Sequence, residues 1–260
     1  MSYECIKVDK DGYVATVTID RPKQRNALNT MVLEELVQAF SALDQDTEVR
    51  AVILTGGGDK AFVAGADIKE MLGKGPREGR KFAELGLAVL DAIEACHAPV
   101  LAAVNGFALG GGTEVALACD LVYASTRAKF GQPEVNLGII PGFGGTQRLS
   151  RLVGRNVAKE IIFTGDLMGA QRAFDIGLVN AVFEPGELTA GVKAVAEKIA
   201  SKGPLAITAA KSAINNGVDL PLASGLEIEK GMFAGLFGSA DQVEGMSAFV
   251  EKRKADFKGE

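Results

Sequence analysis

The sequence predicts a layered α/β core followed by a helical C-terminal region. Two observations lead to this prediction. Along the first part of the chain, short β-branched or wholly apolar segments alternate with longer segments of helical spacing. Beyond about residue 200, the apolar residues keep helical spacing only. We therefore expect a core with the functional site at residues 1–200 and a helical assembly region at residues 201–260.

The first half of the core begins with a strand. Val14–Ile19 alternates in the β-branched pattern of a half-buried strand. Asn29 or Thr30 can then cap a helix, because the apolar residues that follow are three or four positions apart (Leu33, Leu36, Val37 and Phe40). Ala51–Thr55 predicts a second strand, which stops at three consecutive glycines.

The second half of the core repeats this alternation. We expect a short helix from about Asp67 and a longer one from about Arg77 to Ala95. Val100–Val104 is a fully apolar strand, a glycine-rich turn leads to a helix at Gly111–Ala118, and Leu121–Ala124 is another strand. No internal repeat stands out in the sequence.

The last sixty residues predict helices, broken at Gly203-Pro204 and at Pro221. Their apolar side chains exceed what a peripheral helix needs (Leu226, Phe233, Leu236, Phe237, Met246 and Phe249). Two interpretations stay open: a surface for assembly, or ordinary packing on the core.

Composition and charge exclude several classes of protein. The chain has 260 residues, of which 47% are hydrophobic and 23% charged, as in ordinary globular proteins. A net charge of −5 argues against a nucleic-acid surface. Cys5, Cys96 and Cys119 lack metal-binding or disulfide spacing. Because residues 1–6 lack leader character and no apolar run is long enough to span a bilayer, we expect a cytoplasmic protein with no membrane partner.

Ala64–Glu70 is the first of three segments that combine glycine, small residues and a carboxylate. Small residues let the backbone approach a ligand, and free N–H groups at a helix start can hold an anion or an oxyanion. The alternative is a simple capped helix start, with Asp67 as its acid.

The second segment, Asn105–Glu114, follows a buried strand and opens a helix. Gly111 and Glu114 are three positions apart, so an amide donor and a carboxylate share one helix face. A phosphate loop needs GK[ST] after the glycines, and a dinucleotide fold needs GxGxxG after its first strand; neither pattern is present. The alternative is tight helix–strand packing with Glu114 in solvent.

The third segment, Phe130–Thr146, places Glu134 between apolar neighbours and before a second glycine-rich turn. Its alternative is a loop acid that faces water. The single histidine, His97, would have to serve any Ser–His or Cys–His pair, and no GxSxG elbow is present. We interpret His97 as a surface or turn residue, and Lys69 either as a solvated lysine or as a partner of a phosphate.

Together these segments resemble the crotonase, or enoyl-CoA hydratase, family. The resemblance spans nearly the whole chain and rests on Arg21-Pro22 to Asn29, Ala64–Glu70, Asn105–Glu114, Phe130–Glu134, Pro141–Leu149 and Ala248–Arg253. It implies a crotonase-like (ClpP/crotonase) α/β spiral of ββα units with a helical C-terminal region for trimerisation. It also implies trimers stacked into hexamers and a role in fatty-acid metabolism.

The resemblance assigns roles to individual residues. The N–H groups of Ala66 and Gly111 would form the oxyanion hole for the thioester oxygen. Glu114 and Glu134 match the paired acids of hydratases, with Glu114 favoured as the activator of water and Glu134 as the proton donor to C2. The substrate or its CoA moiety would lie against Ala64, Asp67, Ile68, Lys69 and Gly142, and a neighbouring subunit would contribute Phe249 and Lys252.

The implied activity is reversible hydration of a short trans-2-enoyl-CoA, with no metal and no cofactor besides the CoA of the substrate. Thr113 stands where many hydratases have Cys, and Phe143 where a small residue is common; a bulky Phe143 favours acyl chains of about four to six carbons. The enzymatic alternative is a Δ3,Δ2-enoyl-CoA isomerase, or a hydratase of branched or cyclic enoyl-CoA. A non-enzymatic acyl-CoA-binding or RNA-binding scaffold predicts lost glutamates or a basic surface, and the sequence has neither.

Overall fold

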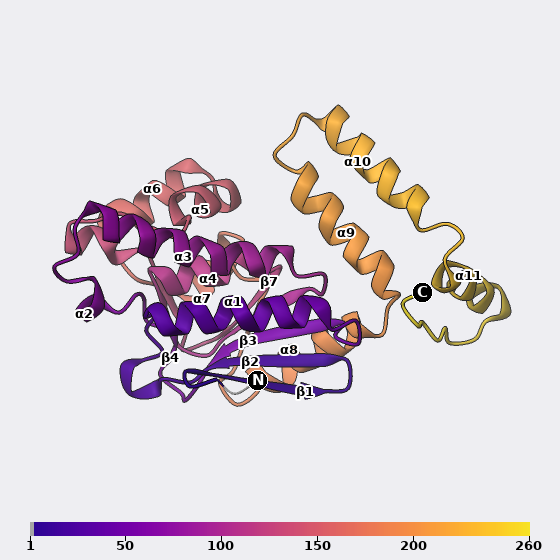
Figure 1. Ribbon diagram of the computed structural model, residues 1–260, viewed down its shortest axis with the longest axis horizontal. Helices are drawn as coiled ribbons and strands as arrows, with labels where there is room; N and C mark the ends of the chain where they lie inside the picture. Colours follow the sequence, from indigo (N-terminus) through magenta and orange to yellow (C-terminus); the bar gives the residue numbers. More distant parts are fainter. Residues whose placement is uncertain (1–2) are drawn as a thin grey trace.

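Two β-sheets and the helices around them form the core of the computed structural model, which describes residues 3–260 (Figure 1). The larger sheet has the order β1 (Ile6–Asp11), β2 (Val14–Ile19), β3 (Ala51–Gly56), β5 (Val100–Val104), β7 (Leu121–Ser125) and β10 (Ala181–Phe183). The smaller sheet has the order β4 (Ala61–Val63), β6 (Phe107–Leu109), β8 (Lys129–Gly131) and β9 (Met168–Gly169). Only the β1–β2 and β8–β9 pairs are antiparallel.

Successive strand pairs build a spiral. In each of β3–β4, β5–β6 and β7–β8, the first strand joins the larger sheet and the second joins the smaller one. The first two pairs lead into α3 (Pro76–Ala95) and α4 (Gly111–Ala118), and the third leads into η2 (Pro133–Leu137). These are the ββα units that the resemblance implied. The sequence did not reveal the repeat, because each second strand has only three residues.

Helices cover both faces of the larger sheet. On one side lie α1 (Thr30–Gln45), α3 and α4, whose buried side chains join the main hydrophobic core. On the other side α8 (Leu188–Ala200) packs over a smaller core, formed with outward-facing residues of the strands. The remaining helices of this part are η1 (Pro22–Gln24), α2 (Ile68–Met71), α5 (Gly145–Val153), α6 (Arg155–Thr164) and α7 (Ala170–Asp175).

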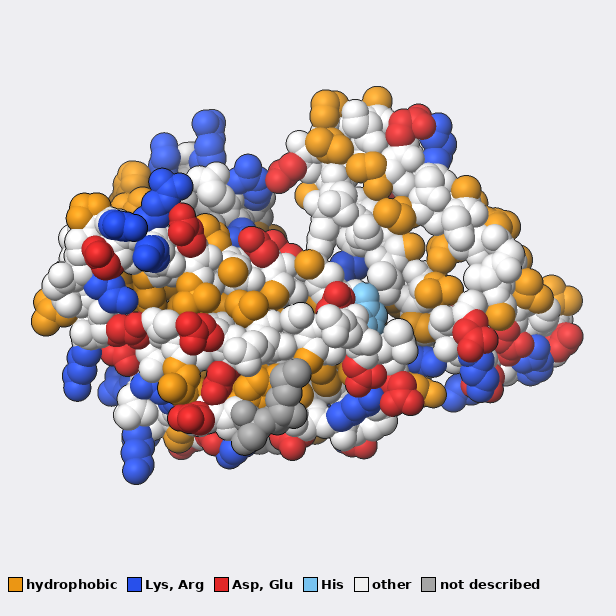
Figure 2. All heavy atoms as spheres, in the orientation of Figure 1, with side chains coloured by type: hydrophobic (Ala, Val, Ile, Leu, Met, Phe, Trp, Pro, Cys, Tyr) orange, Lys and Arg blue, Asp and Glu red, His pale blue; other side chains and the backbone are white. Residues whose placement is uncertain are grey.

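The chain ends in three helices: α9 (Pro204–Gly217), α10 (Leu222–Gly235) and α11 (Ala240–Glu251). The predicted breaks at Gly203-Pro204 and Pro221 are confirmed. Figure 1 shows α9 and α10 as a hairpin that projects from the core, and neither helix has a buried residue. In Figure 2, apolar side chains are spread over this hairpin. The division at residue 200 stays a prediction; it coincides with the end of α8.

After Arg148 the core contains two short strands that the sequence did not predict. These are β9 and β10, edge strands too short to leave a periodic pattern in the sequence. Within residues 3–260, no helix combines the length and the apolar character that a bilayer crossing demands. Met1 and Ser2, which begin the segment expected to lack leader character, lie outside the described residues.

Candidate active site

The three segments that combine glycine, small residues and a carboxylate meet at one cavity of about 350 Å³. They are Ala64–Glu70, Asn105–Glu114 and Phe130–Thr146. Its walls come from the turn before α2, from α3, from the start of α4, from η2 and from the turn before α5. Glu114, Glu134, Ala66 and Gly111 all line this cavity. The structure therefore brings together four residues that are spread over 69 positions of the sequence, 66 to 134 counted inclusively.

Glu114 is held deep inside the protein. It lies in the first turn of α4 and is 2% exposed. Its Oε1 accepts hydrogen bonds from the backbone N–H groups of Phe143 (2.8 Å) and Gly145 (2.7 Å). Burial raises the pKa of Glu114, while the two amides and the positive charge of Arg148 act in the opposite direction. Glu114 therefore does not lie in solvent, as the alternative interpretation of this segment required, and its role as an acid in the reaction stays a prediction.

Glu134 approaches from the other side, in the first turn of η2. Burial raises its pKa to about 7, and the negative charge of Glu114 adds to the rise. A Cβ atom added at Gly110 would lie 2.6 Å from Glu134 Oε1, so this carboxyl group reaches the start of α4. The two acids thus come from different elements and titrate as interacting groups.

Gln132 is a site residue to which sequence reasoning gave no role. It is fully buried. In the orientation in which its amide nitrogen faces Glu134, it donates to Oε1 (2.9 Å) and Oε2 (3.1 Å) of that carboxyl group. A polar amide two positions before the acid, within an apolar segment, was the available signal.

The backbone of Ala66 and of Gly111, the two expected oxyanion donors, lines the cavity. Leu28 N–H donates to Gly65 O (2.9 Å) and Asp67 N–H donates to Leu28 O (2.8 Å), which fixes Ala66 between them. Gly110, with φ of 51°, starts α4 and leads into Gly111. Within residues 3–260, neither the Ala66 nor the Gly111 amide has a hydrogen-bond acceptor. Both are therefore available to a ligand oxygen in the cavity.

The other residues predicted to bind substrate divide into three groups. Ala64, Ile68 and Gly142 line the cavity. Asp67 and Lys69 lie beside it: Asp67 caps α2 by accepting from the Lys69 N–H (3.2 Å), as in the simpler interpretation of this segment. Phe249 and Lys252 lie at α11, at the opposite end of the molecule from α2, and do not line this cavity (Figure 1). Their reach into a neighbouring subunit stays a prediction.

Phe143 closes one wall of the cavity. Its ring is 4% exposed and lies 5.5 Å from the ring of Phe82, centroid to centroid. A Cβ atom at Gly86 would collide with the Phe143 ring, so the missing side chain on α3 makes room for it. The bulky side chain of Phe143, which we expected near the acyl group, therefore forms part of the cavity wall.

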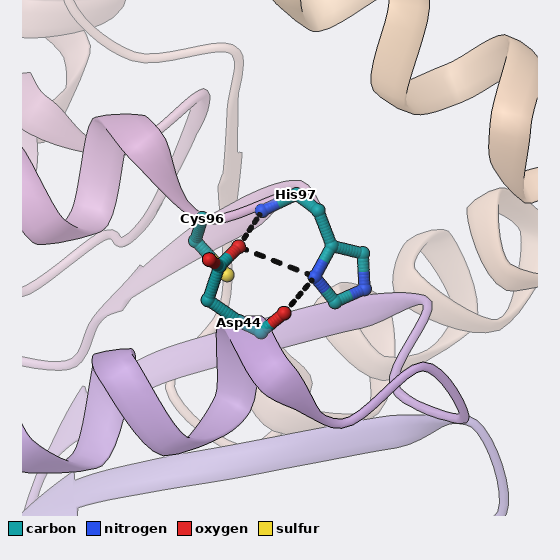
Figure 3. Close-up of side chains that lie close together, drawn as sticks. All are labelled: Asp44, Cys96 and His97. Atoms are coloured by element: carbon teal, nitrogen blue, oxygen red, sulfur yellow. Dashed lines mark hydrogen bonds and ion pairs between the residues drawn. The ribbon is translucent and has the colours of Figure 1, made fainter.

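A second cluster lies away from this cavity. Asp44, Cys96 and His97 bring three metal-type ligand atoms within 4.8 Å of one another (Figure 3). Both ring nitrogens of His97 already face backbone carbonyl oxygens, Asp44 O at 3.0 Å and Val49 O at 2.8 Å. His97 lies in a bend before β5, as expected for a turn residue. The sequence did not reveal its hydrogen bonds to Asp44 at the end of α1. A second cavity of about 480 Å³ lies beside His97, and neither Glu114 nor Glu134 lines it.

Comparison with known proteins identifies the family. A family model described as enoyl-CoA hydratase/isomerase matches residues 9–260. The chain belongs to this family. It is 51% identical over 256 residues to the short-chain-enoyl-CoA hydratase of Clostridium acetobutylicum, with 98% of each chain covered. It is 51% identical over 257 residues to the crotonyl-CoA hydratase of Syntrophomonas wolfei, with 99% of each chain covered.

Solved structures of enoyl-CoA hydratases share the fold. The crystal structure of the enoyl-CoA hydratase from Bacillus anthracis superposes with a TM-score of 0.96 at 43% identity, covering 99% of this chain and 100% of that one. The predicted resemblance and the crotonase-like fold class are therefore confirmed. The two glutamates and the two free amides lie in a chain that matches proteins named hydratases over 98–99% of its length.

Proposed function

We propose that the protein is an enoyl-CoA hydratase, a carbon–oxygen lyase that adds water reversibly to a trans-2-enoyl-CoA to give a 3-hydroxyacyl-CoA. The observation that carries this proposal is the convergence of Glu114 and Glu134 with the free amides of Ala66 and Gly111 on one cavity. The hydratase names of the relatives at 51% identity support it.

The two amides serve the thioester. When water adds at C3, negative charge moves onto the thioester oxygen, and the N–H groups of Ala66 and Gly111 donate to it. Each such preorganised donor is commonly worth about 3–4 kcal/mol of transition-state stabilisation. The donors need no reorganisation, because neither is engaged elsewhere within the described chain.

The two acids divide the proton transfers. Glu114, whose Oε1 is held by two amides, orients water with its carboxylate and takes a proton from it. Glu134 delivers a proton to C2, and its pKa, raised to about 7, lets a large share of the carboxyl groups carry that proton near neutral pH. Hydroxide joins C3 and a proton joins C2, so the reaction is redox-neutral and needs no cofactor besides the CoA of its substrate.

The test is the loss of crotonyl-CoA enone absorbance when pure protein is added. Glu114→Gln and Glu134→Gln are each expected to lower kcat by about three orders of magnitude or more, because an amide neither accepts nor delivers the proton. Binding of a CoA ester should persist in both variants. Near-normal turnover in either variant would remove that residue from its assigned role.

We further propose a preference for acyl chains of about four to six carbons, because Phe143 and Phe82 close the cavity wall. The measurement is kcat/KM for enoyl-CoA substrates from four to sixteen carbons. The expected series falls with length in the wild-type chain and falls less steeply in Phe143→Ala. A wild-type series that rises with length contradicts the preference.

We also propose that the protein assembles as a hexamer, a dimer of trimers, in the cytoplasm. The unburied apolar residues of α9 and α10 support assembly, because a contiguous apolar surface of this kind normally packs against a partner. Sedimentation should then give the mass of six chains of 27.1 kDa; a monomer would contradict this proposal without touching the chemistry.

A further inference from the structure

Arg148 holds the turn that holds Glu114. The amides of Phe143 and Gly145, which donate to Glu114 Oε1, belong to this turn. On its other side, Arg148 Nη1 donates to the carbonyl oxygen of Phe143 (3.2 Å). A Cβ atom at Gly144, where φ is 97°, would collide with the guanidinium. Phe143 is therefore fixed at both its N–H and its C=O.

Arg148 is itself held by α3. Its Nε and Nη2 donate to the two carboxylate oxygens of Glu94 at 2.6 and 2.8 Å, a bidentate pair that fixes the plane of the guanidinium. Asp91 lies 3.6 Å from Nη2. The Arg148 side chain is 19% exposed, so this is not a freely solvated surface pair. A continuous set of contacts runs from Glu94 through Arg148 and the turn to Glu114.

The same residues set the charge around Glu114. The positive charge of Arg148 lowers the pKa of Glu114 against the larger effect of burial, and hydrogen bonding to Glu94 raises the pKa of Arg148. The other ionisable groups nearby are Glu134 on η2 and, next to Arg148, Asp91 on α3. Strands β4 and β6, which also pack on α4, carry no ionisable side chain.

Resting on the proposed hydratase function, we propose that Arg148, oriented by Glu94, is a positioning residue for Glu114. It holds the two amides in place and favours the carboxylate form that accepts the proton from water. The competing interpretation is a salt bridge that only joins α3 to α5 and contributes to stability.

Three variants separate geometry from charge. Arg148→Gln removes both, and kcat is expected to fall about 10- to 100-fold with KM changed less than about threefold. Arg148→Lys keeps the charge but cannot span Glu94 and the Phe143 carbonyl at once. Glu94→Gln keeps the guanidinium and removes a negative charge. Lower kcat is expected in all three, but the acid limb of the pH profile should move differently in each.

The acid limb of the pH profile should move with the pKa of Glu114, because the carboxylate form of Glu114 is the form that accepts the proton. Without Arg148, the pKa of Glu114 rises, so the acid limb of kcat against pH moves to higher pH in Arg148→Gln. In Glu94→Gln the positive charge is less neutralised, so the limb moves to lower pH. In Arg148→Lys the limb stays near that of the wild type. A purely structural salt bridge produces no such opposite shifts.

Arg151→Gln is the matched control, because Arg151 lies on the same helix and pairs in solvent with Asp219 (3.1 Å). Its kcat and pH profile should equal those of the wild type, and thermal unfolding of every variant reports folding. If Arg148→Gln fails to fold, Arg148→Lys and Glu94→Gln still decide. Unchanged kcat and unchanged acid limbs in an active enzyme overturn this proposal alone; a wild-type chain that does not hydrate crotonyl-CoA overturns the proposed function and this proposal with it.

Discussion

Helices α4 and α10 are both rich in small and apolar residues, yet their surroundings are opposite. Seven of the eight residues of α4 are buried, against β4, β6, α3 and α5. No residue of α10 is buried, and its main neighbour is α9. A helix without a clear polar face must be covered on all sides, because otherwise its apolar side chains stay exposed to water. The chain itself covers α4, and we propose that other copies of the chain cover α10.

The difference between the two helices also separates the residues of the cavity from the residues proposed for assembly. The enclosure of α4 by its own chain fixes Gly111 and Glu114 at the wall of the cavity, and burial strengthens the hydrogen bonds and charge interactions of Glu114. The hairpin of α9 and α10 contributes no residue to that cavity. Substitutions in α4 should therefore disturb both chemistry and stability, whereas substitutions in α10 should leave the chemistry unchanged.

Gly112→Ala in α4 should show the largest effect. A Cβ atom there would collide with the carbonyl oxygen of Val63, a backbone atom of β4 that cannot rotate away. We expect destabilisation of about 3 kcal/mol, at the upper end for overpacking. A displaced α4 should also lower kcat about 100-fold, because Gly111 and Glu114 move with it. Urea unfolding and crotonyl-CoA kinetics check both; a stable, fully active variant would show that α4 is loosely packed.

Local pattern predicted strands β2, β3, β5 and β7, helices α1 to α4 and the helical C-terminal region, and it placed Gly111 and Glu114 on one helix face. It could not show that Glu134 reaches the start of α4, because β7 and β8, which belong to different sheets, lie between them in the chain. The bond between Glu94 and Arg148 was missed for the same reason, because these residues lie 54 positions apart. Gln132 lies only two positions from Glu134, and the local pattern did not show that its amide is buried. Periodicity records which face of an element is apolar; it does not record which elements meet. For α10, it left assembly and core packing equally open.

Glu134→Gln should stabilise the protein while abolishing activity. The folded-state pKa of Glu134 is raised from about 4.5 to about 7, so the native state holds the proton more tightly than the unfolded state. The wild-type chain therefore loses stability as pH rises through this range, and the neutral Gln does not. At pH 8 we expect the variant to be more stable by about 1–2 kcal/mol, discounted for solvent access.

Urea unfolding at pH 4 and at pH 8 measures this difference. The advantage of Glu134→Gln should vanish near pH 4, where Glu134 is protonated in both states. An advantage of equal size at both pH values would mean that packing, and not ionisation, is responsible. The matched control is Glu187→Gln, which replaces an exposed carboxyl group at the start of α8.

Gly231→Ala in α10 should show the smallest effect on the isolated chain, and it is the counterpart of Gly112→Ala. A Cβ atom at Gly231 meets nothing within 4 Å, and alanine has the higher helix propensity, so α10 gains about 0.5–1 kcal/mol if it stands in solvent. Activity should match the wild type, because α10 contributes nothing to the cavity of its own chain. Thermal unfolding and sedimentation decide between two outcomes. A stabilised protein of unchanged mass shows that Gly231 faces water even in the assembly, whereas a smaller mass shows that a neighbouring chain packs closely there, in the space that this glycine leaves.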